Sequence, residues 1–376
     1  MKIDSVLPDG VSFFGYYNIS PGNYNNEIVF CSVNEEINHP TPNNKLHINI
    51  KSQSKSRLIG TTNSWNWQQG CMLQWLPPKY EQIIFNDYDS VSGSYVCKIF
   101  NKEGGLIGKF KGPTSNISKC GSYALFFNYD RLSTINPSYG YNCKKDIKLP
   151  PDDKDGIWKI DLSTGVSYLI ITLEQLKTLN YSKTMDDAVH KVNHIDINPT
   201  GTRFIFIHRW RSPMGRFHRL ISADKHGKDL YILNGDRMTS HCCWYDDQTI
   251  ISFCHIEGKG DGYYILTDKT HSRKLLSEKL PKEDGHPSVS TDKKWLLTDT
   301  YPDSARMSKL LLYNFQKDKI IELGRFYQPL RYKNAFRIDL HPKWGLDRKN
   351  IFFESGHNGK RQLYQMNIGN LLHNSQ

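Results

Sequence analysis

The stretch that decides the fold reads HIDINPTGTRFIFIHRWR and runs from His194 to Arg211. Asn198-Pro199 and Thr200-Gly201 are turn dipeptides, and an apolar run rich in β-formers follows them. This order predicts a hairpin of two strands with imidazoles and guanidiniums at its open end. Similar stretches begin at three later histidines, which are His241, His286 and His341.

Each hairpin is followed by further short apolar runs, and two earlier hairpins, within 69–86 and 114–128, lack the histidine. Units of about four short strands, repeated along a chain, are typical of β-propeller blades. The sequence predicts an all-β fold, a seven-bladed β-propeller with four-stranded antiparallel blades around a central channel. The segment 2–7 is expected to complete the last blade. We expect residues 1–376 to form one such domain, with insertions at about 133–155 and 173–192.

Composition restricts the partners. The 376 residues carry a net charge of +11, which favours an anionic partner. Because no basic block or arginine-rich helix is present, an acidic glycan is favoured over nucleic acid. An apolar signal core and a membrane-spanning run are both missing from the sequence, so we expect no membrane span. Eight irregularly spaced cysteines favour a reducing, cytoplasmic location. The sequence does not indicate an oligomeric state.

Hairpin geometry predicts where the polar residues gather. The first strand of each hairpin starts at the same edge of the blade at which the second strand ends. The four histidines are therefore expected at one mouth of the channel, and the other end is expected to carry ordinary polar turns. Repeated histidines can also be purely structural, so this alternative stays open. Polar residues near the mouth or in the early blades are assigned to substrate binding: Asn66, Gln68, Asn86, Arg131, His194 and Arg337.

A family resemblance rests on the serial hairpins and on four short motifs: His208-Arg209-Trp210-Arg211, Ser240-His241, Gly285-His286 and Asp339-Leu340-His341. On these the chain resembles the seven-bladed propeller polysaccharide lyases, namely the oligogalacturonate lyases and, more distantly, the ulvan-lyase-like propellers. In the former, an arginine, a base histidine and metal-binding histidines follow in that order. The resemblance implies Arg209 or Arg211 as the arginine and His241 as the base.

The resemblance also implies a divalent metal ion, Mn²⁺ or Zn²⁺, held by His286, Asp339 and His341. The family's last cluster reads Gln-x-x-His-x-His, and this chain departs from it with Phe336 and Asp339 in the first two places. A carboxylate is itself a ligand for either metal.

These roles correspond to β-elimination in a uronate-containing glycan. A cation neutralises the uronate carboxylate while a neutral imidazole removes the adjacent proton. Candidates for protonating the departing oxygen are His208, His255 and Tyr263. Two other functions stay open. One is a non-catalytic propeller that binds an acidic glycan or a protein, and the other is a glycoside hydrolase, which needs a pair of carboxylates. Candidates for that pair are Asp299, Asp339 and Glu354.

Overall fold

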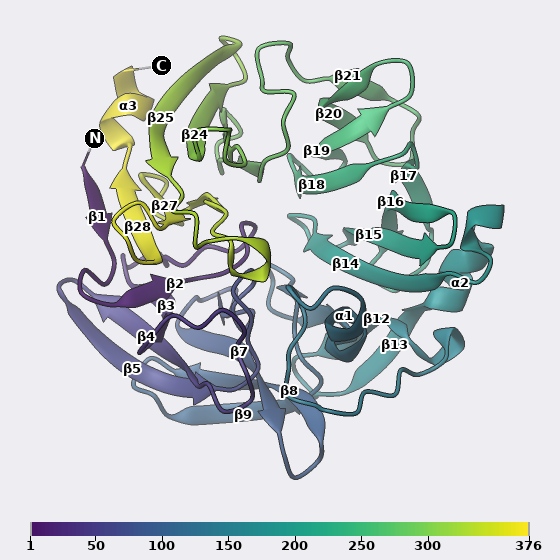
Figure 1. Cartoon of the computed structure of the whole chain (residues 1–376), viewed down its shortest axis with the longest axis horizontal. Helices are drawn as coiled ribbons and strands as arrows, with labels where there is room; N and C mark the ends of the chain where they lie inside the picture. Colours follow the sequence, from purple (N-terminus) through teal and green to yellow (C-terminus); the bar gives the residue numbers. More distant parts are fainter. Residues whose placement is uncertain (1, 375–376) are drawn as a thin grey trace.

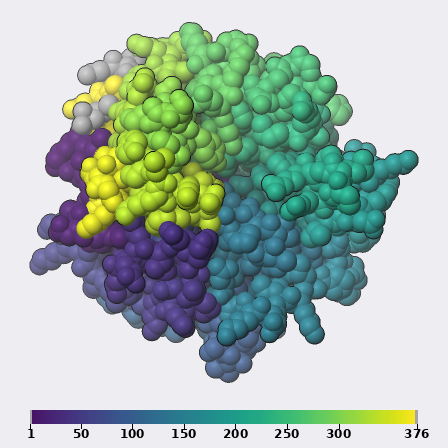
Figure 2. All heavy atoms as spheres, in the orientation of Figure 1, coloured from purple at the N-terminus to yellow at the C-terminus, as the bar shows by residue number. Residues whose placement is uncertain are grey.

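The computed structural model describes residues 2–374 and contains seven four-stranded antiparallel sheets around a common axis (Figure 1). The predicted seven-bladed propeller is confirmed. Figure 2 shows the same ring filled by side chains, with a hollow near the centre of this face. Within 2–374, every helix is too short or too polar to cross a membrane.

The first three blades run from the channel outward in chain order. Blade one contains β2 (Val11–Phe13), β3 (Ile28–Val33), β4 (Leu46–Ser52) and β5 (Lys55–Thr62). Blade two contains β6 (Gln74–Trp75), β7 (Gln82–Asp89), β8 (Ser94–Asn101) and β9 (Leu106–Lys111). Blade three contains β10 (Asn116–Ile117), β11 (Tyr123–Phe127), β12 (Gly156–Asp161) and β13 (Ser167–Thr172).

The next three blades repeat this order. Blade four contains β14 (Val189–Ile197), β15 (Arg203–Ser212), β16 (Gly215–Asp224) and β17 (Tyr231–Asn234). Blade five contains β18 (Thr239–Trp244), β19 (Thr249–Ile256), β20 (Gly260–Thr267) and β21 (Arg273–Leu275). Blade six contains β22 (Ser288–Val289), β23 (Trp295–Asp299), β24 (Met307–Asn314) and β25 (Lys319–Tyr327).

The seventh blade joins the two ends of the chain. It contains β26 (Lys343–Trp344), β27 (Asn350–Ser355) and β28 (Gln362–Asn367), and β1 (Ile3–Ser5) is its outermost strand. β1 pairs antiparallel with β28, with Ile3 opposite Met366, as expected for the N-terminal segment. The ends of the chain therefore lie close together in Figure 1. The N-terminal segment thus closes the ring by completing the last blade.

The middle strands supply the core because sheets pack against them on both faces. Val29, Phe30 and Cys31 of β3 are fully buried, and so are Ile205, Phe206 and Ile207 of β15. Such strands read as continuous apolar runs rather than as alternating ones. This explains why the hairpins stand out in the sequence.

Helices occupy the connections. α1 (Tyr129–Ile135) follows β11 and lies near the centre of the ring in Figure 1. α2 (Leu173–Thr178) starts with a capping box between Thr172 and Gln175, and α3 (Gly369–Asn374) ends the described chain. Short 3₁₀ turns lie at Asp152–Lys154, Lys183–Met185 and Asn334–Phe336. β14 begins at Val189, inside the stretch expected as an insertion, because His190 and Lys191 are strand residues despite their polarity.

Candidate functional site

Four histidines form an arc on or just before the innermost strands of blades four to seven. Adjacent ring centroids are 5.4 Å apart for His194 and His241, 4.1 Å for His241 and His286, and 4.4 Å for His286 and His341. All four side chains are buried. The structure thus brings together the histidines that four separate repeats supply, and we call this group the histidine arc.

The backbone is irregular at the arc. His194 and His241 lie where the ladders β14–β15 and β18–β19 shift register, and such bulges redirect side chains. His194 has a φ of 53° and His341 a φ of 44°, which is the left-handed region. Non-glycine residues rarely adopt it, and conformations of this kind cluster at functional sites. The fold therefore keeps strained backbone where the imidazoles converge.

A segment that follows β2 crosses the channel beside the arc, and we call residues 14–17 the channel plug. Glu354 of blade seven accepts hydrogen bonds from the backbone amides of Phe14 and Gly15, at 3.2 and 2.9 Å. The Tyr17 hydroxyl donates to the carbonyl of Cys242 in blade five at 2.7 Å and accepts from its amide at 3.0 Å. The plug is thus held from two sides of the ring.

Two tyrosine rings of the plug support the arc. The ring of Tyr17 lies 5.5 Å from that of His241 and 5.3 Å from that of His286. The Tyr16 hydroxyl is hydrogen-bonded to His194, and the Tyr16 ring lies 5.6 Å from His341. Sequence reasoning missed both tyrosines, because their loop belongs to the first blade and its partners lie hundreds of residues away.

His286, Asp339 and His341 form a group suited to a metal ion. One ligand atom of each lies within 4.8 Å of the others, and all three residues are buried. Asp339 Oδ1 and both ring nitrogens of His341 have no hydrogen-bond partner. Buried polar atoms left unpaired cost free energy, so an ion that binds them removes this cost. Two imidazoles and a carboxylate are ligands of Mn²⁺ and Zn²⁺, so these residues fit such an ion.

Asp299 orients two of these ligands from behind. Its carboxylate accepts hydrogen bonds from the amide and Nδ1 of His286, at 2.7 and 2.9 Å, and from the amide of His341 at 3.2 Å. Occupying Nδ1 in this way leaves Nε2 of His286 available to a metal ion, the arrangement found in the carboxylate–histidine pairs of metal sites. Burial lowers the pKa of His286, but Asp299 outweighs this and raises it above its ordinary value.

His241 and Asp284 form a second pair. Nδ1 of His241 lies 3.0 Å from Asp284 Oδ1, and Asp284 Oδ2 also accepts from the Ser240 hydroxyl at 2.5 Å. Burial lowers the pKa of His241 despite the neighbouring carboxylate, so its imidazole is neutral near pH 7. The bond to Asp284 places the proton on Nδ1 and leaves the Nε2 lone pair free. Sequence reasoning missed Asp284, although it stands only two residues before His286.

Arginines and tyrosines complete the rim. Arg337 donates from Nε to Asp339 at 2.9 Å and from Nη2 to the Tyr139 hydroxyl at 2.8 Å. Tyr301 lies 5.7 Å from the His286 ring. Burial lowers the pKa of Arg209, whose Nε has no hydrogen-bond partner. Arg211, two residues further along β15, is exposed on the same face of the strand.

The three residues expected to protonate the departing oxygen are bonded elsewhere. His208 is buried between His190, at 2.9 Å, and Arg219, at 3.1 Å. His255 faces Asp261 at 2.7 Å, and the buried Tyr263 hydroxyl bonds to Thr298 at 2.8 Å. The structure therefore does not place these three groups together with the arc.

Four of the predicted substrate-binding residues bond to the chain itself. Asn66 caps its own turn by accepting from the amides of residues 68 and 69, and Gln68 donates to the carbonyls of residues 335 and 337. Asn86 donates to the carbonyl of residue 114 and to the hydroxyl of residue 141. Arg131 pairs with the carboxylate of residue 155 at 2.6 Å. Only His194 and Arg337 of that set lie in the arc or at its rim.

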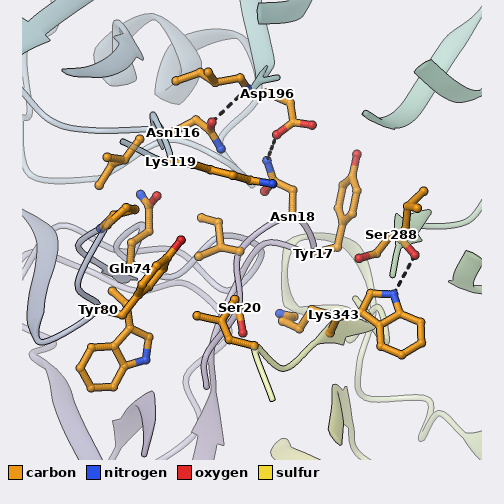
Figure 3. Close-up of a pocket in the computed structure, with 18 residues that line it drawn as sticks. Tyr17, Asn18, Ser20, Gln74, Tyr80, Asn116, Lys119, Asp196, Ser288 and Lys343 are labelled. Carbon is orange, nitrogen blue, oxygen red and sulfur yellow. Dashed lines mark hydrogen bonds between the residues drawn. The ribbon is translucent and has the colours of Figure 1, made fainter. Parts of the chain in front are cut away.

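The opposite end of the channel holds a second polar pocket, where we expected ordinary turns (Figure 3). Its volume is 210 Å³, and Tyr17 of the plug lines it. Asp196 accepts from Asn18 at 3.3 Å, and burial raises the pKa of Asp196 to about 7. In Figure 3 the Lys119 side chain extends toward Asn18 and Asp196. The two ends thus differ in chemistry, since this end pairs a carboxyl group with an amide whereas the other end is rich in imidazoles.

Neither family models nor curated protein sequences match the chain. Among solved structures, an oligogalacturonate lyase in complex with manganese superposes with a TM-score of 0.69 at 13% identity, covering 97% of this chain and 92% of that one. The chain has the fold of the oligogalacturonate lyases.

A second oligogalacturonate lyase, from Vibrio parahaemolyticus, gives a TM-score of 0.68 at 9% identity and covers 97% of this chain and 93% of that one. The β-propeller domain of the Trilobed protease from Pyrococcus furiosus gives 0.53 at 11% identity, with 94% of both chains covered. At such identities the likeness concerns the fold, and the propeller also occurs in peptidases.

Proposed function

We propose that this protein is a lyase that cleaves an acidic, uronate-containing polysaccharide or oligosaccharide by β-elimination. The observation that carries the proposal is the pairing of two groups in one arc. His241 has a neutral imidazole that can act as a base. Its ring centroid lies 4.1 Å from that of His286, which belongs to the group suited to a metal ion. The fold shared with oligogalacturonate lyases supports this proposal.

The difficult step is removal of a weakly acidic proton next to a carboxylate. His286, Asp339 and His341 would hold a divalent ion, which would supply positive charge beside the uronate carboxylate as the proton leaves. The side chain of His241 accepts the proton at Nε2, because Asp284 holds its Nδ1 proton in place and burial keeps the ring neutral.

Arginine side chains hold the substrate in place. Arg209 has a buried Nε without a partner, so its guanidinium is free to donate to a uronate carboxylate. Arg337 is oriented by its bonds to Asp339 and Tyr139. The hydroxyl of Tyr139 or Tyr301, both at the rim, then protonates the departing oxygen.

The hydrolase alternative is disfavoured by the partners of its carboxylates. Asp299 accepts hydrogen bonds from both His286 and His341. Glu354 accepts hydrogen bonds from two backbone amides of the channel plug and forms an ion pair with Arg361. Carboxylates committed to structural bonds are poorly placed to act as the acid and base of hydrolysis.

The test is the product. The protein is loaded with Mn²⁺ or Zn²⁺ and mixed with oligogalacturonate and other uronate oligomers, and the absorbance of an unsaturated uronate is followed. Elimination creates a carbon–carbon double bond, whereas hydrolysis creates a new reducing end without one. Cleavage without the double bond contradicts the proposal. So does the absence of any cleavage when the bound metal is confirmed by elemental analysis.

A further inference from the structure

A basic cavity opens on one face of blade four, next to the arc. Its volume is 390 Å³, and Arg209 is the residue that it shares with the arc's surroundings. Its basic side chains come from three adjacent strands of one sheet: Lys191 of β14, Arg209 and Arg211 of β15, and Arg216 and His218 of β16. Burial lowers the pKa of His218 to about 4, so its ring is neutral near pH 7. None of its lining residues is acidic. We call this group the basic face.

Strand register places like charges directly opposite one another in two rows. In the first row Lys191 pairs with Arg209, which also lies opposite the neutral His218. In the next row on the same face, Arg211 pairs with Arg216. Opposed side chains stand about 5 Å apart at Cβ, where like charges destabilise a sheet. The fold thus maintains a repulsive arrangement that a bound anion would relieve.

The charges also lack partners within the chain. Over the described residues, no ion pair joins Lys191, Arg211 or Arg216 to a carboxylate. Lys191 is only 8% exposed. Burial, together with Arg209 and Arg216, lowers its pKa to about 7. A buried lysine without an anion is unusual, since buried charges are normally paired.

The number of donors distinguishes between kinds of anion. A carboxylate offers two oxygens in one plane and a single charge, which one guanidinium satisfies by a bidentate pair. A sulfate or phosphate ester offers three terminal oxygens that point in different directions, so several donors can converge on it. The basic face supplies donors from two cross-strand rows, with Lys191 and Arg209 in one row and Arg211 and Arg216 in the other.

We propose that the basic face binds a tetrahedral oxyanion, the sulfate or phosphate ester of a sugar. The site goes beyond the proposed elimination, because it needs no glycosidic bond to be broken. A glycan that carries both a uronate and such an ester would engage the arc and the basic face together.

Binding is measured by titration calorimetry at constant ionic strength with glucose 6-sulfate, glucose 6-phosphate and galacturonate. We expect one or both esters to bind more tightly than the carboxylate sugar, and the tighter ester identifies the source of the oxyanion. Arg216→Gln removes one charge-assisted donor and weakens ester binding roughly 10- to 100-fold. The control Lys274→Gln removes the same charge from an exposed position in blade five and leaves binding unchanged.

Melting temperature separates this role from a structural one. Arg216→Gln relieves the repulsion with Arg211, so the ligand-free variant should melt no lower than the wild type. A lower melting temperature together with unchanged ester affinity assigns Arg216 to structure and overturns the proposal. Equal affinity for galacturonate and both esters overturns it as well. These monosaccharides undergo no elimination, so the outcome is independent of whether the protein is a lyase.

Discussion

The two ends of the central channel are built from the same repeated hairpins but differ in how their polar atoms are satisfied. At the histidine arc, the ring nitrogens of His341 and Oδ1 of Asp339 have no hydrogen-bond partners. At the opposite end, Asp196 is hydrogen-bonded to Asn18, and burial raises its pKa to about 7. The arc therefore contains buried polar atoms that no other group of the chain satisfies, whereas the opposite pocket carries a carboxyl group that burial keeps from ionising readily.

This difference shows how a ring of similar repeats acquires two chemically different ends. Strand starts point histidines into one mouth, and the plug then separates that mouth from the pocket below. Tyr17 touches both sides, since its ring contacts His241 and His286 while it also lines the opposite pocket. The two ends can therefore be perturbed one at a time, and four variants follow in order of expected effect.

The largest effect is expected from His241→Ala at the arc. Without its imidazole no group accepts the substrate proton, so kcat should fall about 10²- to 10⁴-fold. Bound metal and melting temperature should change little, because His241 is not one of the three proposed ligands. The measurement combines steady-state kinetics with elemental analysis, and His255→Ala serves as a control because its partner is Asp261. Unfolding of His241→Ala would instead assign the residue to structure.

Asp196→Asn tests the opposite end through pH. In the unfolded chain this carboxyl ionises above its ordinary pKa of 3.8, whereas in the native state it stays protonated up to about 7. The native state binds more protons in this window, so wild-type stability falls as pH rises from about 4 to 7, by at most about 4 kcal/mol. Asn has no such proton to lose. Urea unfolding measures the free energy of unfolding of both proteins. The difference between the variant and the wild type should be more favourable to the variant at pH 8 than at pH 5.

If the unfolding free energies of the variant and the wild type differ by the same amount at pH 5 and pH 8, Asp196 ionises normally in the native state. Kinetics offer a second check, because this substitution should leave kcat unchanged if the plug isolates the two ends.

Asp339→Asn removes the anionic ligand of the arc while keeping its shape. Changes in the outer shell of metal sites already cost 10- to 100-fold in affinity, so this ligand change should cost at least that much. Titration with Mn²⁺ measures it, and Asp261→Asn, an exposed carboxylate of blade five, is the matched control. Unchanged Mn²⁺ affinity would show that the ion does not bind at these three residues.

Tyr17→Phe should have the smallest effect and acts on both ends. It deletes the hydroxyl that bonds to the amide and carbonyl of Cys242, which leaves two buried backbone groups unpaired. The expected cost in unfolding free energy is about 1 to 3 kcal/mol. Denaturant unfolding measures it against Tyr24→Phe, whose side chain is exposed. Since the ring remains, Mn²⁺ affinity should be unaffected, and a loss of affinity would show that the hydroxyl also orders the arc.

The fold was predictable because its signals are local and repeated. Each hairpin carries its own turn, and the fully buried middle strands read as short apolar runs such as Ile205–Ile207. The arc was predictable for the same reason, since strand starts in a propeller converge at one mouth. The pairing of β1 with β28 followed from the strand that the last blade lacked.

What escaped prediction lies on loops whose positions depend on distant contacts. Tyr16 and Tyr17 reach the arc only because Glu354, more than 330 residues later, binds their segment. Tyr139 lies in the long connection after α1 and reaches the rim through its bond with Arg337. Likewise, the opposite pocket forms where Asn18 meets Asp196, two residues that belong to different blades. Neither hydrophobic periodicity nor turn residues in the sequence predict such contacts between distant segments.

Ring closure has a consequence for biosynthesis. β1 pairs with β28, which is translated only after the other six blades. At about 5 to 20 residues per second, the intervening chain takes roughly 20 to 70 s to translate. Throughout that interval the channel plug lacks Glu354, and the arc lacks His341. Neither the channel plug nor the histidine arc is therefore complete until blade seven has been translated, and a premature stop in that blade would leave both unfinished.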